Sequence, residues 1–292
     1  MPGPKVTVLI PNYKTPEVTR LCLRLLRKNT PPDMVRVIVI DNDSADDSLA
    51  YLKSLEWIEL IERRGVVDDT PSQSESRALD LALERVDTPY VLAIHTDTLV
   101  KDPRWVEVLL EEIERDDTVA GVGSWKLETP PGLGKCLAKT LEYRVRLLRY
   151  TLAGDRQGVR KVRDQIDGGY YRIGNQQAVP RSGEGREYYF LRSHCALYRM
   201  DLVRKYGLTF SQNDETASKG MSKHLVEEGY RLVYLSARYL SDYLMHLNHA
   251  TMVFHPELGS GSRTIRKGLK RIRRILDEMD ADTILADDSL DR

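Results

Sequence analysis

The sequence predicts an α/β fold in which helices cover both faces of a mostly parallel sheet. Three apolar runs are continuous rather than alternating, which is typical of strands buried on both faces. They span residues 6–10, 35–40 and 90–94. Helical patterns separate these runs, and a βαβα order implies right-handed crossovers within a doubly wound sheet. The chain has 292 residues, 41% of them hydrophobic, so it can bury a sizeable core.

Weaker signals complete the first half of the sheet. The segments 58–61 and 119–122 are predicted as two further strands. Capping residues, or proline in the first turn, indicate where three helices begin. These starts are Thr15-Pro16, a capping box from Ser44 to Asp47, and Asp102-Pro103.

The second half is less regular. A basic helical pattern over 135–163 and a loop rich in Gly, Arg and Gln over 168–185 indicate an insertion that covers the sheet, within 126–187. Ordered elements are predicted again beyond it: a strand within 188–198, helices over 201–206 and 219–228, and a strand over 231–235. A basic amphipathic helix, 263–276, and an acidic tail end the sequence.

Composition excludes several classes of protein. Lys plus Arg equal Asp plus Glu at 44 each, so no overall positive field favours nucleic acid. No apolar run approaches the roughly 18 residues that cross a bilayer, and no secretory signal is visible, so the expected location is cytoplasmic. The three cysteines are widely spaced, which favours reduced, buried thiols over disulfides or a zinc cluster.

Polar clusters directly follow three of the predicted strands, where ligands of open parallel sheets bind. They are Pro11-Asn12-Tyr13, Asp41-Asn42-Asp43-Ser44 and His95-Thr96-Asp97-Thr98. No glycine lies between Lys5 and Asp41, so neither a dinucleotide-binding turn nor a P-loop can follow the first two strands. Carboxylates at strand ends instead suit the hydrogen-bond donors of a nucleoside and a divalent cation on phosphate.

The three segments 6–13, 37–44 and 90–97, taken in order, resemble the N-terminal half of the family 2 glycosyltransferases. The resemblance covers 5–125 well and 188–251 loosely. It implies a GT-A-like fold in which 1–125 binds the donor and 126–262 is the acceptor-binding and catalytic half of the same domain. The segment 263–292 then holds the basic helix and acidic tail.

The implied activity is inverting transfer of one sugar from a nucleotide sugar to a hydroxyl acceptor, with Mg²⁺ or Mn²⁺ as cofactor. A UDP-sugar is the favoured donor, with GDP- and dTDP-sugars as alternatives; the acceptor is a glycan, a glycolipid or a small molecule. The Q-x-x-R-W signature of processive synthases is absent. We therefore expect single additions rather than polymer extrusion.

The resemblance also assigns roles to residues. It makes Pro11, Asn12 and Tyr13 a wall of the nucleotide pocket and Asp41 the acceptor for base or ribose. Asp97 becomes a metal ligand, against the alternative of a simple turn residue. The other candidate donor contacts are Asp43, Arg77, Asp80, His95 and Thr96.

Some positions depart from the family pattern. His95 stands where the first Asp of the Asp-x-Asp motif is usual, so it contacts ribose or phosphate, or supports the metal as an imidazole donor. Asp80 replaces a common Asn, and Arg77 serves the diphosphate or only solvates its helix. A late motif similar to the family's makes His246 the candidate second metal ligand, ahead of His249 and His255.

The catalytic base is expected upstream of Gly229-Tyr230-Arg231, where the nearest acids are Asp214 and Glu215. Either can accept the proton of the acceptor hydroxyl; the alternative is a solvated loop acid.

Two rival functions remain open from sequence: a nucleotidyltransferase, and a binding module that has lost catalysis. For helix 263–276, packing explains the apolar stripe, and contact with an anionic membrane at the inner face also explains the charge. The acidic tail either neutralises this helix or is disordered.

Overall fold

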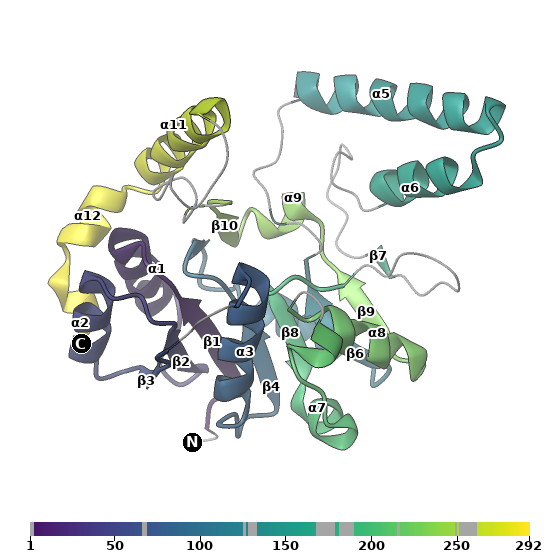
Figure 1. The fold of residues 1–292 in the computed structure, drawn as a ribbon. Coiled ribbons are helices and arrows are strands. Elements are labelled where there is room, and N and C mark those ends of the chain that lie inside the picture. The colour runs from purple at the N-terminus through teal and green to yellow at the C-terminus, as the bar shows by residue number, and fades with distance from the viewer. Residues whose placement is uncertain are drawn as a thin grey trace.

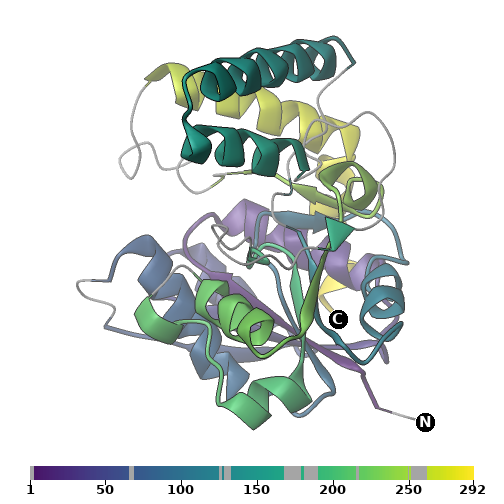
Figure 2. The same cartoon turned by 90° about the vertical axis from the view of Figure 1, so that its right-hand side faces the viewer.

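The computed structural model describes residues 3–65, 69–124, 127, 133–167, 179–180, 190–214, 217–248, 250 and 262–292. Within these residues, eight strands form one sheet in the order β3-β2-β1-β4-β8-β6-β9-β7, with helices on both faces (Figures 1 and 2). The predicted α/β class is therefore confirmed. The strands of this sheet are β1 (Val6–Asn12), β2 (Val35–Asp41), β3 (Glu59–Glu62), β4 (Tyr90–Ala93), β6 (Val119–Gly123), β7 (Val179–Pro180), β8 (Ala196–Arg199) and β9 (Arg231–Tyr234).

The centre of the sheet is parallel. Strand β1 lies between β2 and β4 and runs parallel to both, with β3 outside β2. Strand β8 is antiparallel to its neighbours β4 and β6, and β9 is parallel to β6. All five strands predicted in the first half are present. The antiparallel direction of β8 was not predicted, and it matters because it brings the start of β8 beside the end of β4.

Burial on both faces explains the continuous apolar runs. In β1, Val6, Val8 and Ile10 belong to the hydrophobic cluster on one face of the sheet, and Leu9 belongs to the cluster on the other. Each face therefore needs apolar residues, and the two-residue alternation of a half-exposed strand is absent.

The helices connect and cover the strands. They are α1 (Pro16–Lys28), α2 (Asp47–Ser54), α3 (Pro71–Leu83), α4 (Glu107–Ile113), α5 (Leu133–Leu152), α6 (Arg156–Asp167), α7 (Met200–Tyr206), α8 (Lys219–Glu227), α9 (Ala237–Leu240), α11 (Ser262–Glu278) and α12 (Ala281–Ala286), with short 3₁₀ turns η1 (Gln212–Asp214) and η3 (Asp288–Asp291). None of the described helices combines the length and the apolar composition needed to cross a bilayer.

The predicted helix starts are right at α1 and wrong at α2 and α4. The N-cap of α2 is Asp46, whose carboxylate accepts from the amide of Ser48 at 2.9 Å. Ser44 instead accepts from the amide of Lys14, so it ties the loop after β2 to the loop after β1. Helix α4 begins at Glu107, because the residues after Asp102 form turns first.

The basic pattern over 135–163 forms two helices instead of one. Helix α5 ends at Leu152 and α6 begins at Arg156, with Gly154 between them at φ 67°. This left-handed conformation suits glycine and reverses the chain. The resulting α5–α6 hairpin stands apart from the sheet in both views (Figures 1 and 2).

The acidic tail folds against α1, so the predicted alternative of disorder is wrong. Arg24 of α1 is 2% exposed and donates to Asp288 at 2.6 Å, to Asp291 at 2.5 Å and to the carbonyl of Leu285 at 2.6 Å. Apolar side chains of α1, α11 and α12 form one cluster beneath these contacts. The tail therefore neutralises a buried cation of the donor half, in addition to the ion pair of Glu278 with Arg274 of the basic helix α11 at 3.5 Å.

Replacing Arg24 by Ala should destabilise the protein by about 2–4 kcal/mol, because two tail carboxylates lose their buried partner. Chemical denaturation measures the change, and Lys28→Ala, at an exposed cation of the same helix, is the matched control. Equal stability of the two variants would contradict the role of Arg24.

Acid should weaken the same contact. Burial raises the pKa of Asp291. Hydrogen bonds from Arg24 and Tyr51 lower this pKa by more than burial raises it, so the net pKa is below the ordinary value. A carboxyl with a lowered folded-state pKa stabilises the fold above its unfolded pKa, about 3.9, and loses that contribution as pH falls through the folded value. We expect stability to decline below about pH 4 in wild type, and the decline to be smaller in Arg24→Ala.

Candidate metal centre

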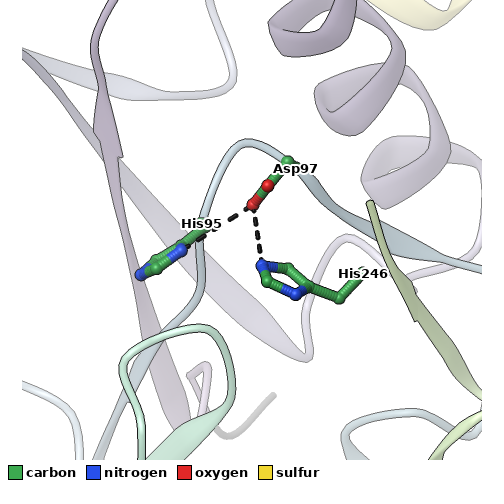
Figure 3. A group of neighbouring side chains, drawn as sticks. All are labelled: His95, Asp97 and His246. Atoms are coloured by element: carbon green, nitrogen blue, oxygen red, sulfur yellow. Dashed lines mark ion pairs between the residues drawn. The ribbon is translucent and has the colours of Figure 1, made fainter. Parts of the chain in front are cut away.

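Two histidines and an aspartate meet beyond the end of β4. The chain leaves β4 through His95 and Asp97 and enters β5 (Thr98–Val100), which pairs antiparallel with β10 (Leu244–His246). In this register His246 lies opposite Thr98, so its ring reaches Asp97 (Figure 3). The small β5–β10 sheet was not predicted, and it brings the late His motif to the predicted metal ligand.

The spacing of these three side chains fits a metal ion. Oδ1 of Asp97 lies 3.0 Å from Nε2 of His246 and 3.7 Å from Nδ1 of His95. One ligand atom from each residue lies within 4.8 Å of the others. Two neighbouring ligands of an octahedral ion at about 2.1 Å are themselves about 3.0 Å apart. The Asp97–His246 pair therefore already has the separation that one cation would require.

The hydrogen bonds of His246 orient its ring for the same purpose. Its Nδ1 lies 3.1 Å from the carbonyl oxygen of Leu127, which can only accept, so Nδ1 carries the proton of a neutral ring. Nε2 then faces Oδ1 of Asp97 at 3.0 Å, the separation of a hydrogen bond from a protonated ring and also of two ligands of one cation. A lone pair facing a carboxylate is stabilised by a cation between them or by protonation of the ring.

Asp97 is held in its ionised form. Its side chain is 13% exposed, and its Oδ2 accepts from the amide of Ala250 at 3.4 Å. Burial raises the pKa of Asp97, but His246 and His95 lower it by more, and the net pKa is well below the ordinary value. A nearly buried carboxylate that stays charged is suited to a divalent cation.

His95 is linked to an acid that sequence reasoning missed. Its Nε2 lies 3.0 Å from Glu75 of α3 and 2.9 Å from the hydroxyl of Ser193, which also donates to Glu75. Burial lowers the pKa of His95, but Glu75 and then Asp97 raise it to about 9. Without a cation His95 is therefore protonated at neutral pH, and a metal would have to displace its proton.

His194 is a second residue that sequence reasoning missed. Its ring stacks on His246 with centroids 4.7 Å apart, and its Nε2 accepts from the amide of Leu127 at 3.1 Å. Burial, then the charges of His246 and His95, hold the pKa of His194 well below its ordinary value. A neutral His194 thus fixes Leu127, whose carbonyl orients His246. The sequence feature that could have indicated His194 is the polar pair Ser193-His194 just before β8. It was overlooked because the predicted strand, within 188–198, included these two residues.

The first two polar clusters lie at the same edge of the sheet. Asn12, fully buried, pairs in register with Asp41, and its amide donates to Oδ1 of Asp41 at 2.8 Å. Strand β1 separates β2 from β4, so the ends of these two strands are about two strand spacings, or roughly 10 Å, apart. Tyr13 is 41% exposed beside them. Asp41 and Asp97 are thus brought to one edge, as predicted.

Two of the remaining donor candidates, Asp80 and Arg77, pair with other residues of the protein. Asp80 accepts from the amides of Phe210 and Ser211 at 2.5 and 3.1 Å, and Arg77 pairs with Asp69. Pro11 is partly buried, Thr96 is buried and Asp43 is exposed. Asp43 also has a positive φ of 60°. The assignment of these residues to a donor pocket remains a prediction.

The predicted base lies at the limit of the described structure. Asp214 ends η1, and only its backbone is described; Glu215, His249 and His255 lie outside the described residues. The assignment of either Asp214 or Glu215 as the base therefore stays a prediction.

Solved structures with this fold include glycosyltransferases. The mannosyltransferase PcManGT from Pyrobaculum calidifontis, in complex with GDP-Man and Mn²⁺, is 17% identical with a TM-score of 0.50, covering 81% of this chain and 56% of its own. S. aureus TarS 1–349 is 16% identical with a TM-score of 0.52, covering 97% and 69%; a longer TarS structure covers 83% and 36%. This chain thus spans little more than half of the mannosyltransferase. These likenesses confirm the predicted GT-A-like fold.

Sequence comparison gives the family. No curated protein matches this sequence. The profile of glycosyl transferase family 2 matches residues 7–207, more than half of the chain, and includes the three strand-end clusters from which the resemblance was predicted. The chain therefore belongs to glycosyl transferase family 2.

Proposed function

We propose that this chain is an inverting, divalent-metal-dependent glycosyltransferase that moves one sugar from a nucleoside diphosphate sugar to a hydroxyl acceptor. The observation that carries the proposal is the meeting of His95, Asp97 and His246 at the sheet edge that also holds Asp41. Membership of the family supports the reaction class. A UDP-sugar is the favoured donor; the GDP-Man and Mn²⁺ bound to PcManGT keep a GDP-sugar open and favour Mn²⁺ or Mg²⁺ as the cation.

The proposal assigns a separate task to each group of residues. A cation at Asp97 and His246 would offset the negative charge that develops on the diphosphate leaving group. Asp97 is ionised for this task, and Leu127 and His194 keep the lone pair of His246 directed at the same point. We assign to Asp41 the task of accepting from base or ribose. Asp214 or Glu215 would take the proton of the acceptor hydroxyl from the opposite face of the sugar.

Product analysis separates this reaction from its rivals. With UDP-, GDP- and dTDP-sugars and a panel of hydroxyl acceptors, we expect release of nucleoside diphosphate and a product of inverted anomeric configuration by NMR. Release of pyrophosphate would indicate nucleotidyl transfer, and nucleotide binding without transfer to any acceptor would indicate a binding module.

Asp97→Asn should lower the affinity for Mn²⁺ at least about tenfold, because the ion loses its charged ligand, and should lower turnover by about a hundredfold or more. Isothermal titration with Mn²⁺ alone measures the first effect without any substrate. Asp33→Asn, at an exposed loop aspartate, is the control. Wild-type Mn²⁺ affinity in Asp97→Asn would remove this residue from the metal site.

Asp41→Asn should affect the affinity for nucleotide but not the affinity for metal. We expect about tenfold weaker binding of the preferred nucleotide, since a charged acceptor becomes a neutral amide, with Mn²⁺ affinity in the absence of nucleotide unchanged. Titration calorimetry measures both constants. Unaltered nucleotide affinity in a folded variant would show that Asp41 has only a structural role, in which it accepts from Asn12 and joins the ends of β1 and β2.

Asp214→Asn and Glu215→Gln, tested singly, should give one large and one small loss of turnover, with nucleotide and Mn²⁺ affinities retained. The large loss identifies the base, because an amide cannot accept the hydroxyl proton. Two small losses would place the base elsewhere.

A further inference from the structure

Helix α5 exposes a continuous apolar stripe. Of the eight large apolar side chains that the described part of the chain exposes, six lie on this one helix, 49–79% exposed. They recur every three or four residues and so share one side of the helix over its 20 residues, about 30 Å. The six are Leu133, Leu137, Leu141, Val145, Leu148 and Leu152. An apolar surface of this length is unusual on a globular protein unless something covers it.

The stripe is not used to build the hairpin. Helix α5 packs on α6 through a different side, where Cys136 and Tyr143 are buried. Gly158 of α6 lies so close to the ring of Tyr150 that a Cβ there would be 2.5 Å from it, which shows how closely the two helices approach. The hairpin is therefore complete without the six apolar side chains.

Positive charge accompanies the stripe. Helix α5 carries five basic residues, Lys135, Lys139, Arg144, Arg146 and Arg149, and one acidic residue, Glu142, which gives a net charge of +4. By helical spacing Arg144 lies next to Leu141 and Leu148, and Arg149 lies next to Val145 and Leu152. Both arginines are exposed. Their aliphatic stems can lie along the apolar surface while the guanidinium groups reach anionic groups.

We propose that this α5 surface docks on an anionic membrane, with the helix lying in the plane of the lipid headgroups. An apolar face flanked by cations is the pattern of helices that bind such interfaces. Pairing with α5 of a second copy would bring two helices of charge +4 together, so charge complementarity favours lipid phosphates over another copy of this chain.

The basic helix α11 is less suited to this contact. Of its predicted stripe, Ile272 is buried in the cluster shared with α1, and Leu269 and Leu276 pack against that cluster, so these three residues are used in the fold. The α5–α6 hairpin lies beyond the same end of the main sheet as β10 (Figures 1 and 2). The docking itself does not rest on the proposed function.

Flotation with vesicles tests the proposal. The full chain should bind vesicles of phosphatidylcholine with about 30% phosphatidylglycerol, bind pure phosphatidylcholine weakly, and lose binding at about 0.5 M salt. Leu141→Gln should lower the partition coefficient about tenfold, because one inserted leucine is lost, and Leu137→Gln/Leu141→Gln should lower it further. Leu81→Gln, at the exposed leucine of α3, is the matched control and should bind as wild type.

The other outcomes overturn the proposal. No binding to the anionic vesicles, or equal loss in Leu81→Gln and Leu141→Gln, would show that the stripe does not contact lipid. A lipid-free dimer in sedimentation equilibrium that Leu141→Gln dissociates would assign the surface to a second copy instead. Since Leu141 is exposed, the melting temperature should not change, and Mn²⁺ affinity of the variant should equal that of wild type, which separates this result from failure of the proposed function.

Discussion

The contact between Asp97 and His246 is the interaction on which the proposed chemistry depends. Asp97 lies between β4 and β5, and His246 ends β10. The β5–β10 pairing brings them together, and the amides of Leu247 and Ala250 extend it by donating to Asp97. Neither Asp97 nor His246 lies in a strand of the main eight-stranded sheet. The two-stranded β5–β10 sheet therefore holds the two metal-ligand candidates in contact. Arg271 of α11 supports this sheet by donating to the carbonyls of Leu247 and Asn248, directly after β10.

Buried polar groups around this contact have little freedom to rearrange. His194 is fixed by Ser124 and by the amide of Leu127, and it stacks on His246. Glu75 and Ser193 hold His95 from the other side. A network satisfied in this way is rigid, because each unpaired group would carry a desolvation penalty in the interior. In the proposed reaction, preorganisation of this kind would keep a cation in place, without reorganisation, as the diphosphate departs.

Sequence alone predicted the strands that build the edge of the site. Continuous apolar runs identified β1, β2 and β4, and the polar residues after them identified Asp41 and Asp97, because parallel strands bring their ends to one edge. Local signals were weaker where tertiary contacts decide: Ser44 looked like a helix cap and instead bonds to the loop after β1. Glu75 and His194 could not be found, since their roles depend on a helix packing over the edge and on the antiparallel direction of β8. The position of the acidic tail could not be predicted either, because it depends on a tertiary contact with Arg24, a cation within an otherwise apolar helix face.

The most direct test of the central claim is a crystal structure of the protein with Mn²⁺ and UDP, and then with GDP, using the anomalous signal of manganese. The account predicts one manganese peak at about 2.1–2.3 Å from both Oδ1 of Asp97 and Nε2 of His246, with the diphosphate on the ion and the nucleoside against Asp41. Manganese bound away from Asp97 and His246, or a nucleotide that does not touch the edge formed by β1, β2 and β4, would contradict it.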